Sequence, residues 1–344
     1  MRMRWFQSFS PGLWGVLVSV CTAVGQPFTL PTANTNLFNP GNEGVFFAAT
    51  ANPSIEPEWM SGAFGCVRNS RTRIHEGIDI RSLVRDRRKE PIDDVLAIAD
   101  GVVMYVNSVA GNSSYGKYIL VGHRVDGLDV VSVYAHLREI GDGVRSGLKV
   151  RQGQRIGMLG RTSNTRSGIS KDRAHVHLEI ALFMNQKYPE WYQKQVPGAR
   201  NDHGMFSGLN LSGLDPRELY LEQRIKGSRF DLVKFVQSQP EICRVQVRKT
   251  HFEFADRYRA LIDRNPDVER QGIAGYEVVL SYAGTPIRLI PLTESQLKSS
   301  KRVFLVSVNE EVQRRNRCRN LVTSDRSGWK LATNGEKVIS LMTY

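Results

Sequence analysis

Alternating apolar and polar positions recur through the first two thirds of the chain and predict β-strands there. The clearest runs are rich in β-branched and aromatic residues: "GVVMYVN" (101–107), "YILVGHR" (118–124) and "DVVSVYAHL" (129–137). The Asp-Gly pair in "VDGL", between the last two runs, is typical of a tight hairpin turn. No convincing helical pattern occurs before residue 185, so the region from about 60 to 183 is predicted to be mainly β.

"AHVHLEI" (174–180) predicts one more strand, and its alternation has a chemical consequence. Side chains alternate across a sheet with period two, so His175, His177 and Glu179 share one face and the apolar residues between them share the other. The apolar face can pack on a core and leave both imidazoles in one cleft. In "DVVSVYAHL" the same alternation places His136 on one face with Tyr134, and we expect His136 to reach that cleft.

The pattern changes after residue 183 and predicts a second unit. An irregular segment ends in a short helix after Asp215-Pro216. Helices are then expected at "RFDLVKFVQSQ" and "FEFADRYRALIDR", followed by strands at "GYEVVLSYAGTPIRLIPL" and "RVFLVSV". We place a boundary near Lys226 and expect residues 226–344 to form a separate α+β domain, long enough for its own core. Its aromatic and basic residues suit wall binding or a helix core equally, and its function is not predicted.

The first 25 residues have the pattern of a secretory signal peptide. Arg2 and Arg4 precede a short apolar stretch and small residues, and we predict cleavage after Gly25. The stretch is too short to span a bilayer, which needs about 20 residues, so no membrane span remains after cleavage; an uncleaved anchor is the alternative. Lipid attachment at Cys21 is disfavoured by the bulky Val20 before it. Residues 26–59, rich in Pro, Asn, Thr and Gly, are expected to be an exposed lead-in.

The predicted export, to a periplasm, cell envelope or extracellular space, affects how the net charge and the cysteines are interpreted. The formal net charge is +13, or +11 without the two arginines of the signal, which favours anionic wall polymers or envelope surfaces as partners. Nucleic acid is excluded by export and by the lack of a recognition motif. An oxidising compartment permits a disulfide, and we expect Cys243 to pair with Cys318 because both lie in the C-terminal third, leaving Cys66 as a small buried residue.

"RIHEGIDI" (73–80) supplies partners for the histidine pair. His75 and Asp79 lie four residues apart around Gly77, in a loop-to-strand setting. Two imidazoles and a carboxylate make a three-ligand zinc site that leaves a fourth position for water, and either His175 or His177 can complete it.

These motifs resemble a known family. "FGCVRN…HEGIDI", "DGVVMYVN", "YGKYILVGH", "YAHL", "QGQRIGMLG" and "HVHLEI" occur in the order found in the LytM/lysostaphin-type zinc peptidases of family M23. The resemblance covers residues 60–225 and implies a mainly β catalytic domain with a narrow cleft. It implies one Zn²⁺ held by His75, Asp79 and His177, with His136 and His175 as catalytic residues beside the metal.

The resemblance also implies the function. We expect an exported zinc metalloendopeptidase that hydrolyses peptide stems or cross-links of bacterial peptidoglycan with a zinc-activated water. The alternative is a non-catalytic or autoinhibited LytM-like protein that binds or regulates the cell wall, and a third possibility is a peptidase for protein substrates. Residues 161–173 and 184–212 are expected to line the substrate groove. Glu179 is expected to support the site, and His123 and His203 to be structural.

Overall fold

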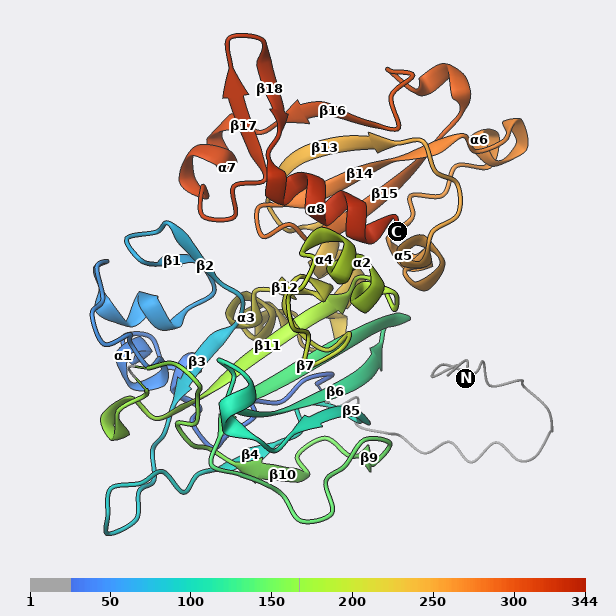
Figure 1. The fold of residues 1–344 in the computed structure, drawn as a ribbon. Helices are drawn as coiled ribbons and strands as arrows, with labels where there is room; N and C mark the ends of the chain where they lie inside the picture. The colour runs from blue at the N-terminus through green and yellow to red at the C-terminus, as the bar shows by residue number, and fades with distance from the viewer. Residues whose placement is uncertain (1–25, 167) are drawn as a thin grey trace, which may run out of the picture.

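A seven-stranded antiparallel sheet forms the centre of the first part of the molecule (Figure 1). The structure is a computed structural model that describes residues 26–166 and 168–344. The strand order is β12-β11-β7-β6-β5-β9, with β3 also paired to β11. The strands are β3 (Ile78–Arg81), β5 (Gly101–Asn107), β6 (Lys117–Val125), β7 (Leu128–Leu137), β9 (Lys149–Val150), β11 (His175–Phe183) and β12 (Leu211–Leu214).

The strands predicted from alternation are all present as β5, β6, β7 and β11. Asp126 and Gly127 form the two-residue turn between β6 and β7, and both have positive φ, 49° and 79°. Because this turn type needs positive φ at both central positions, the Asp-Gly pair fixes the register of the hairpin.

Strand β11 is the best-supported strand of the sheet. One of its edges pairs with β7, and the other pairs first with β3 and then with β12. All nine of its residues are buried. A strand held on both edges and covered on both faces is a rigid platform for side chains.

Two smaller sheets flank the large one. β1 (Gly65–Arg68) and β2 (Arg73–His75) form a two-stranded ribbon with an irregular register. A three-stranded sheet contains β4 (Asp94–Leu96), β10 (Arg155–Met158) and β8 (Glu139–Ile140).

The expectation of an exposed lead-in at residues 26–59 is wrong with respect to exposure. Phe28, Phe46 and Phe47 are completely buried, and Phe47 forms an isolated β-bridge with Ile80 of β3. The turn-forming residues shape the backbone while the aromatic side chains between them reach the core. The segment contains the short helices η1 (Asn36–Phe38), α1 (Glu43–Phe46) and η2 (Glu58–Gly62).

The C-terminal part is an α+β unit built on a four-stranded antiparallel sheet of order β15-β14-β13-β16. The expected helices and strands are present in shorter form, whereas the strands β13, β17 and β18 and the helices α6, α7 and α8 were not predicted. The strands are β13 (Glu241–Val247), β14 (Gly275–Ser281), β15 (Pro286–Leu292), β16 (Val303–Val308), β17 (Val322–Asp325) and β18 (Gly328–Leu331). The helices are α4 (Leu232–Gln237), α5 (Glu253–Arg257), α6 (Pro266–Gln271), α7 (Glu310–Arg315) and α8 (Thr333–Met342).

The two parts pack against each other. Helices α2 (Tyr188–Gln195) and α3 (Pro216–Lys226) lie between them in Figure 1, and one cluster of buried residues runs through both parts, from Phe28 to Met342. The amide of Phe183 donates to Tyr258 Oη at 2.7 Å, and Asn185 Nδ2 donates to the carbonyl of Leu341 at 3.0 Å. Helix α3 ends at Lys226, but the domain boundary there stays a prediction.

The predicted disulfide is wrong. Cys66 of β1 is bonded to Cys318, and Cys243 is a free, buried thiol in β13. Proximity in sequence was a poor guide because the packing of the two parts brings Cys318 to the β1–β2 ribbon.

Two features of the chain bear on the membrane and on export. Within the described residues, no helix combines the length and apolar character needed to cross a bilayer. The predicted signal peptide, residues 1–25, lies outside the described residues.

Candidate metal centre and its cleft

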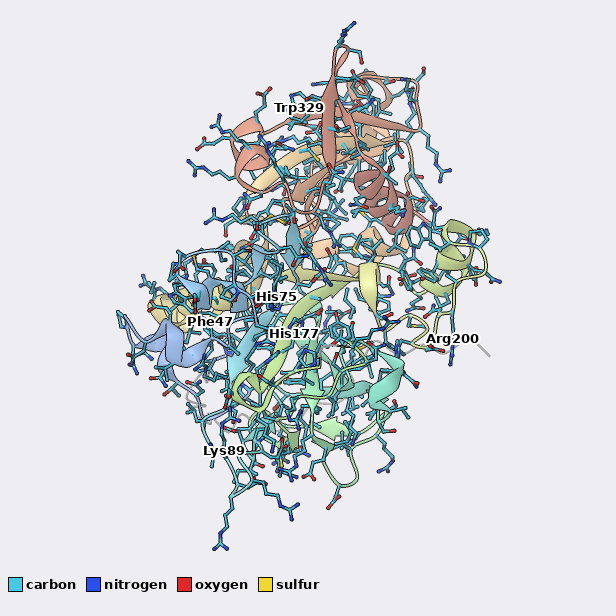
Figure 2. The ribbon with its side chains drawn as sticks, turned by 60° about the vertical axis from the view of Figure 1, so that its left-hand side comes forward. Phe47, His75, Lys89, His177, Arg200 and Trp329 are labelled. Atoms are coloured by element: carbon cyan, nitrogen blue, oxygen red, sulfur yellow. A yellow bond between two sulfur atoms is a disulfide. The ribbon has the colours of Figure 1, made fainter. Side chains whose placement is uncertain are left out.

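His75, Asp79 and His177 converge on one point, although they come from β2, β3 and β11. Figure 2 labels His75 and His177, which lie next to each other. His75 Nε2 lies 3.0 Å from His177 Nδ1 and 3.1 Å from Asp79 Oδ1. The third side of the triangle, from His177 Nδ1 to Asp79 Oδ1, is 2.9 Å. In the register of the sheet, His177 faces Asp79 directly across the β3–β11 pair.

These donor atoms fit a zinc ion. Two imidazole nitrogens and a carboxylate oxygen are typical zinc ligands, and bond lengths near 2.1 Å in a tetrahedron put ligand atoms about 3.4 Å apart. The observed triangle is slightly tighter, so a small outward movement of the side chains accommodates the ion. All three residues are buried, which limits competition from water.

Hydrogen bonds from behind orient both histidine rings. His75 Nδ1 lies 2.7 Å from the carbonyl oxygen of Ala63, which can only accept, so Nδ1 carries the proton and Nε2 is free to coordinate. His177 is reversed: its Nε2 lies 2.9 Å from Glu179 Oε1, which leaves Nδ1 toward Asp79. Tyr115 Oη donates to the same Glu179 oxygen. Glu179 is therefore placed where the sequence analysis expects a supporting residue.

The charges in the metal-free centre are set by burial and by the neighbouring ionised groups. Burial, together with the positive charge of Arg68, lowers the pKa of His75 to about 4. Burial also opposes protonation of His177, but the carboxylates of Asp79 and Glu179 outweigh it and raise the pKa of His177 to about 9. Burial alone would raise the pKa of Asp79, yet the surrounding histidines and Arg68 hold it well below its usual range. The metal-free site thus holds a proton on His177 between two carboxylates.

His136 reaches the cleft by a different route from the one predicted. In a regular strand it would share a face with Tyr134, which packs in the core on the far side of the sheet. The β6–β7 register is irregular opposite Lys117–Ile119, and His136 has a positive φ of 62°. This irregularity turns the His136 ring to the same side as His177, with ring centroids 5.9 Å apart.

His136 and His175 form a second histidine pair beside the metal triangle, with ring centroids 4.8 Å apart. His136 Nδ1 is 2.9 Å from the carbonyl oxygen of Thr162, and His175 Nδ1 is 2.6 Å from that of Arg173. Burial lowers the pKa of both rings, well below the usual range in His136. Both are consequently neutral at pH 7, with Nε2 as the available acceptor.

Arg68 belongs to the site and was missed by the sequence analysis. Its Nη2 lies 2.5 Å from Asp79 Oδ2 and 3.0 Å from His75 Nε2. Tyr115, which contacts Glu179, was also missed. Both residues lie in motifs that carry the family resemblance, and only that context could have pointed to them.

The cleft over these residues has a volume of about 420 Å³. The loop 161–173 contributes to its wall, as expected, through Ser163, Thr165, Gly168, Ile169 and Arg173. Of the described residues that line it, none comes from 184–212. The lining also includes residues of the lead-in segment, within 50–54, and of the β1–β2 ribbon, and Arg173 of the loop donates to the carbonyl of Ala49 at 2.9 Å. His123 and His203 are also absent from the described lining and are hydrogen-bonded elsewhere, His123 to Ser132 and His203 to Tyr105.

Part of the chain matches a known peptidase family. Residues 73–189 match the model of peptidase family M23, and no curated protein matches the chain. Among solved structures, a zinc-containing peptidase from Vibrio cholerae is similar at 21% identity over 40% of this chain and 36% of that one, with a TM-score of 0.26. The catalytic domain of lysostaphin from Staphylococcus simulans is similar at 19% identity over 45% of this chain and 86% of that one, with a TM-score of 0.27. A mutant catalytic domain of a prophage-encoded M23 protein from Enterococcus faecalis is similar at 24% identity over 40% of this chain and 81% of that one, with a TM-score of 0.25.

Proposed function

We propose that this chain, whose residues 73–189 form a peptidase family M23 domain, is an exported zinc metalloendopeptidase that cleaves peptide stems or cross-links of bacterial peptidoglycan. The observation that carries the proposal is the meeting of two histidine pairs and Asp79 at the floor of one cleft. His75, Asp79 and His177 are the proposed ligands, and His136 and His175 the proposed catalytic residues.

The protein residues divide the work by charge and position. A bound Zn²⁺ would supply a Lewis acid that polarises a carbonyl and lowers the pKa of a water towards 7. His136 and His175 are neutral, with Nε2 turned to the cleft, so either can accept a proton from the attacking water. Once protonated, the same ring can donate to the oxyanion or to the leaving amine.

The shape of the cleft favours an extended peptide. The lead-in segment, the β1–β2 ribbon and loop 161–173 all contribute residues to its lining. Arg68 and Arg173 line the cleft and provide positive charge for the carboxylates of stem peptides. The net charge of +11 that is left without the two arginines of the predicted signal favours retention on anionic wall material.

The test uses the zinc-loaded protein and purified cross-linked muropeptides, with products identified by mass spectrometry. Cleavage by the wild type and none by His177→Ala would support the proposal and identify the bond. Stoichiometric zinc without cleavage of any muropeptide would favour the non-catalytic or autoinhibited alternative. A wild type that binds no zinc would refute the metal site.

A further inference from the structure

The β1–β2 ribbon, which carries His75, has little support of its own. It has two short strands and an irregular register, and isolated ribbons of this kind are marginally stable. Its connecting loop contains three consecutive residues with positive φ, Asn69, Ser70 and Arg71. Such backbone is unfavourable for residues other than glycine.

This ribbon nevertheless supplies one of the three ligands of the metal triangle, His75. Gly65 of β1 is paired with His75 of β2, and the carbonyl of Ala63, just before β1, accepts the hydrogen bond that orients the His75 ring. Arg68, at the end of β1, contacts both His75 and Asp79. A shift of β1 would therefore move the Ala63 carbonyl, which orients His75. It would also move the Arg68 guanidinium, which contacts both His75 and Asp79.

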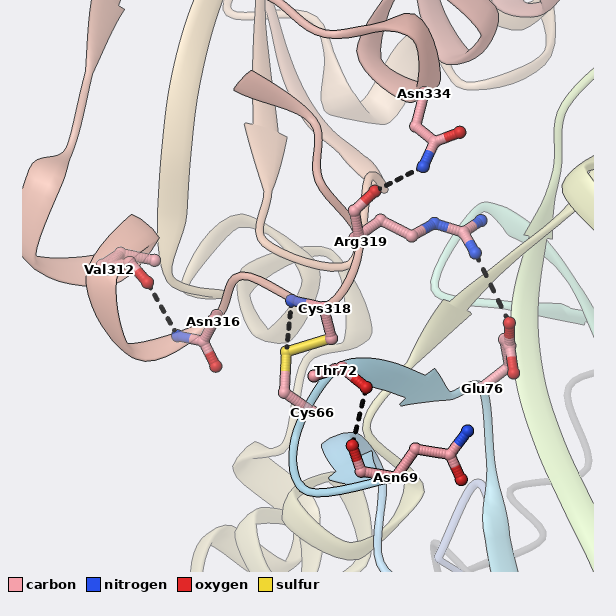
Figure 3. Close-up of a disulfide and its surroundings, with 9 residues drawn as sticks. All are labelled: Cys66, Asn69, Thr72, Glu76, Val312, Asn316, Cys318, Arg319 and Asn334. Atoms are coloured by element: carbon pink, nitrogen blue, oxygen red, sulfur yellow. Dashed lines mark hydrogen bonds and ion pairs between the residues drawn. A yellow bond between two sulfur atoms is a disulfide. The ribbon is translucent and has the colours of Figure 1, made fainter. Parts of the chain in front are cut away.

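A segment of the C-terminal part, residues 316–320, holds the ribbon at two points (Figure 3). Cys318 is disulfide-bonded to Cys66, at the middle of β1, and its amide lies 3.3 Å from Cys66 Sγ. Arg319 Nη1 lies 3.4 Å from Oε1 of Glu76, the residue that follows His75. The two contacts thus fall on β1 and directly beyond β2.

The segment is itself anchored in the C-terminal part. Asn334 of α8 donates to the carbonyl of Arg319 at 2.9 Å, and Asn316 donates to the carbonyl of Val312 in α7 at 3.0 Å. The segment thus connects the ribbon to two helices of the other part. Tyr282 adds a third contact, because its ring packs against that of Phe64 beside β1.

We propose that residues 316–320 are a positioning element for the metal centre, acting on His75 and Arg68 through the Cys66–Cys318 disulfide and the Arg319–Glu76 ion pair. This assigns a role in the site to a segment outside residues 73–189, and it rests on the proposed zinc site. The effect is local: His177, held by the central sheet, does not depend on the segment.

The test compares Cys66→Ala/Cys318→Ala and Arg319→Gln with two controls, Cys243→Ala and Arg317→Gln. Cys243 is the free thiol, and Arg317 is an exposed arginine of the same segment. Zinc affinity is measured by competition with a chromophoric chelator, and amide hydrogen exchange is followed by mass spectrometry in residues 63–77 and 175–183. Circular dichroism verifies that each variant is folded.

The double variant should bind zinc about 10-fold more weakly, the lower end of the range for groups that orient a ligand. Arg319→Gln should weaken it about 2-fold, because the ion pair is partly exposed. Exchange should accelerate in 63–77 and stay unchanged in 175–183, and both controls should match the wild type.

Two outcomes would overturn the proposal. One is zinc affinity and exchange equal to the wild type in both variants. The other is equal acceleration in 63–77 and 175–183, which would indicate general stabilisation. If the double variant does not fold, Arg319→Gln carries the test. A wild type that binds no zinc would refute the proposed function instead, and exchange alone would then decide the role of the segment.

Discussion

The central sheet and the β1–β2 ribbon hold opposite sides of the same metal triangle by different means. His177 and Asp79 face each other in paired strands, and β11 is bonded along both edges and buried throughout. His75 stands at the end of a three-residue strand whose partner β1 is fixed by a disulfide from the other part of the chain. The ribbon side, which has less support, therefore limits how well ordered the whole metal site can be.

The orienting groups differ in the same way. On the sheet side the acceptor behind His177 is a charged side chain, Glu179, from the same strand. On the ribbon side the acceptor behind His75 is a backbone carbonyl, Ala63, whose place depends on the path of the chain. Side-chain changes can therefore test the sheet side directly, whereas the ribbon side is tested through its supports.

The largest expected effect comes from removing one ligand from each side. His177→Ala and His75→Ala should both abolish stoichiometric zinc binding and muropeptide cleavage, because two remaining donors do not form a zinc site. Zinc content by elemental analysis and cleavage by mass spectrometry provide the readouts. His251→Ala, an exposed histidine of the C-terminal part, is the control and should behave as the wild type. Full activity in either ligand variant would refute the assignment.

Removal of the His136 ring should separate catalysis from metal binding. His136→Ala should keep zinc and lose about 100- to 10,000-fold in turnover, the range for a general acid or base. His136→Asn is the matched variant, because asparagine tolerates the positive φ at this position. An equal loss in both would assign the effect to the imidazole, and undiminished turnover would exclude His136 from the chemistry.

Weakening the support behind His177 should have a smaller effect. Glu179→Gln replaces the anionic acceptor of His177 Nε2–H with a neutral one, and we expect about 10- to 100-fold weaker zinc binding. Chelator competition measures this change, and Glu336→Gln, on the exposed side of α8, is the control. Unchanged affinity would show that the sheet backbone alone orients His177.

A histidine on the other face of the sheet should affect stability alone. His123 is hydrogen-bonded to Ser132 and to the carbonyl of Asp100, and burial lowers its pKa to about 4 from an ordinary 6.5. As the pH falls, His123 takes up its proton near pH 6.5 in the unfolded chain but only near pH 4 in the folded protein. The free energy of unfolding is therefore highest above pH 6.5 and decreases by about 3 kcal/mol as the pH falls towards 4.

His123→Gln removes this proton uptake. Urea unfolding of the metal-free protein at pH 7.5 and 4.5 should show that the wild type loses about 2.5 kcal/mol more on acidification than the variant does. An equal loss in both proteins would mean that His123 is not kept neutral by burial.

The sequence predicted the sheet side of the site better than the ribbon side. Alternation located β5, β6, β7 and β11 because their periodicity is a property of each strand alone. The spacing pointed to His75 and Asp79 with either His175 or His177, the family resemblance named His177, and the structure brings His75, Asp79 and His177 together, although their roles stay predictions. The α+β character of the C-terminal part was likewise visible in local patterns.

What the sequence could not predict depends on tertiary packing. Cys66 pairs with Cys318 because two parts of the chain dock, and no local pattern records that contact. The face of His136 was inferred from regular alternation, which the strand irregularity breaks. Phe46 and Phe47 lie among turn-forming residues, so their burial has no periodic signature.

The separation of the disulfide in sequence sets an order of events during folding. Cys66 and Cys318 are 252 residues apart, so the first thiol emerges long before its partner, and Cys243 emerges between them as a competing partner. Burial in β13 raises the pKa of the Cys243 thiol to about 12, which removes the reactive thiolate. The folded core thereby withdraws the competing cysteine from thiol–disulfide exchange and leaves Cys66 and Cys318 as partners.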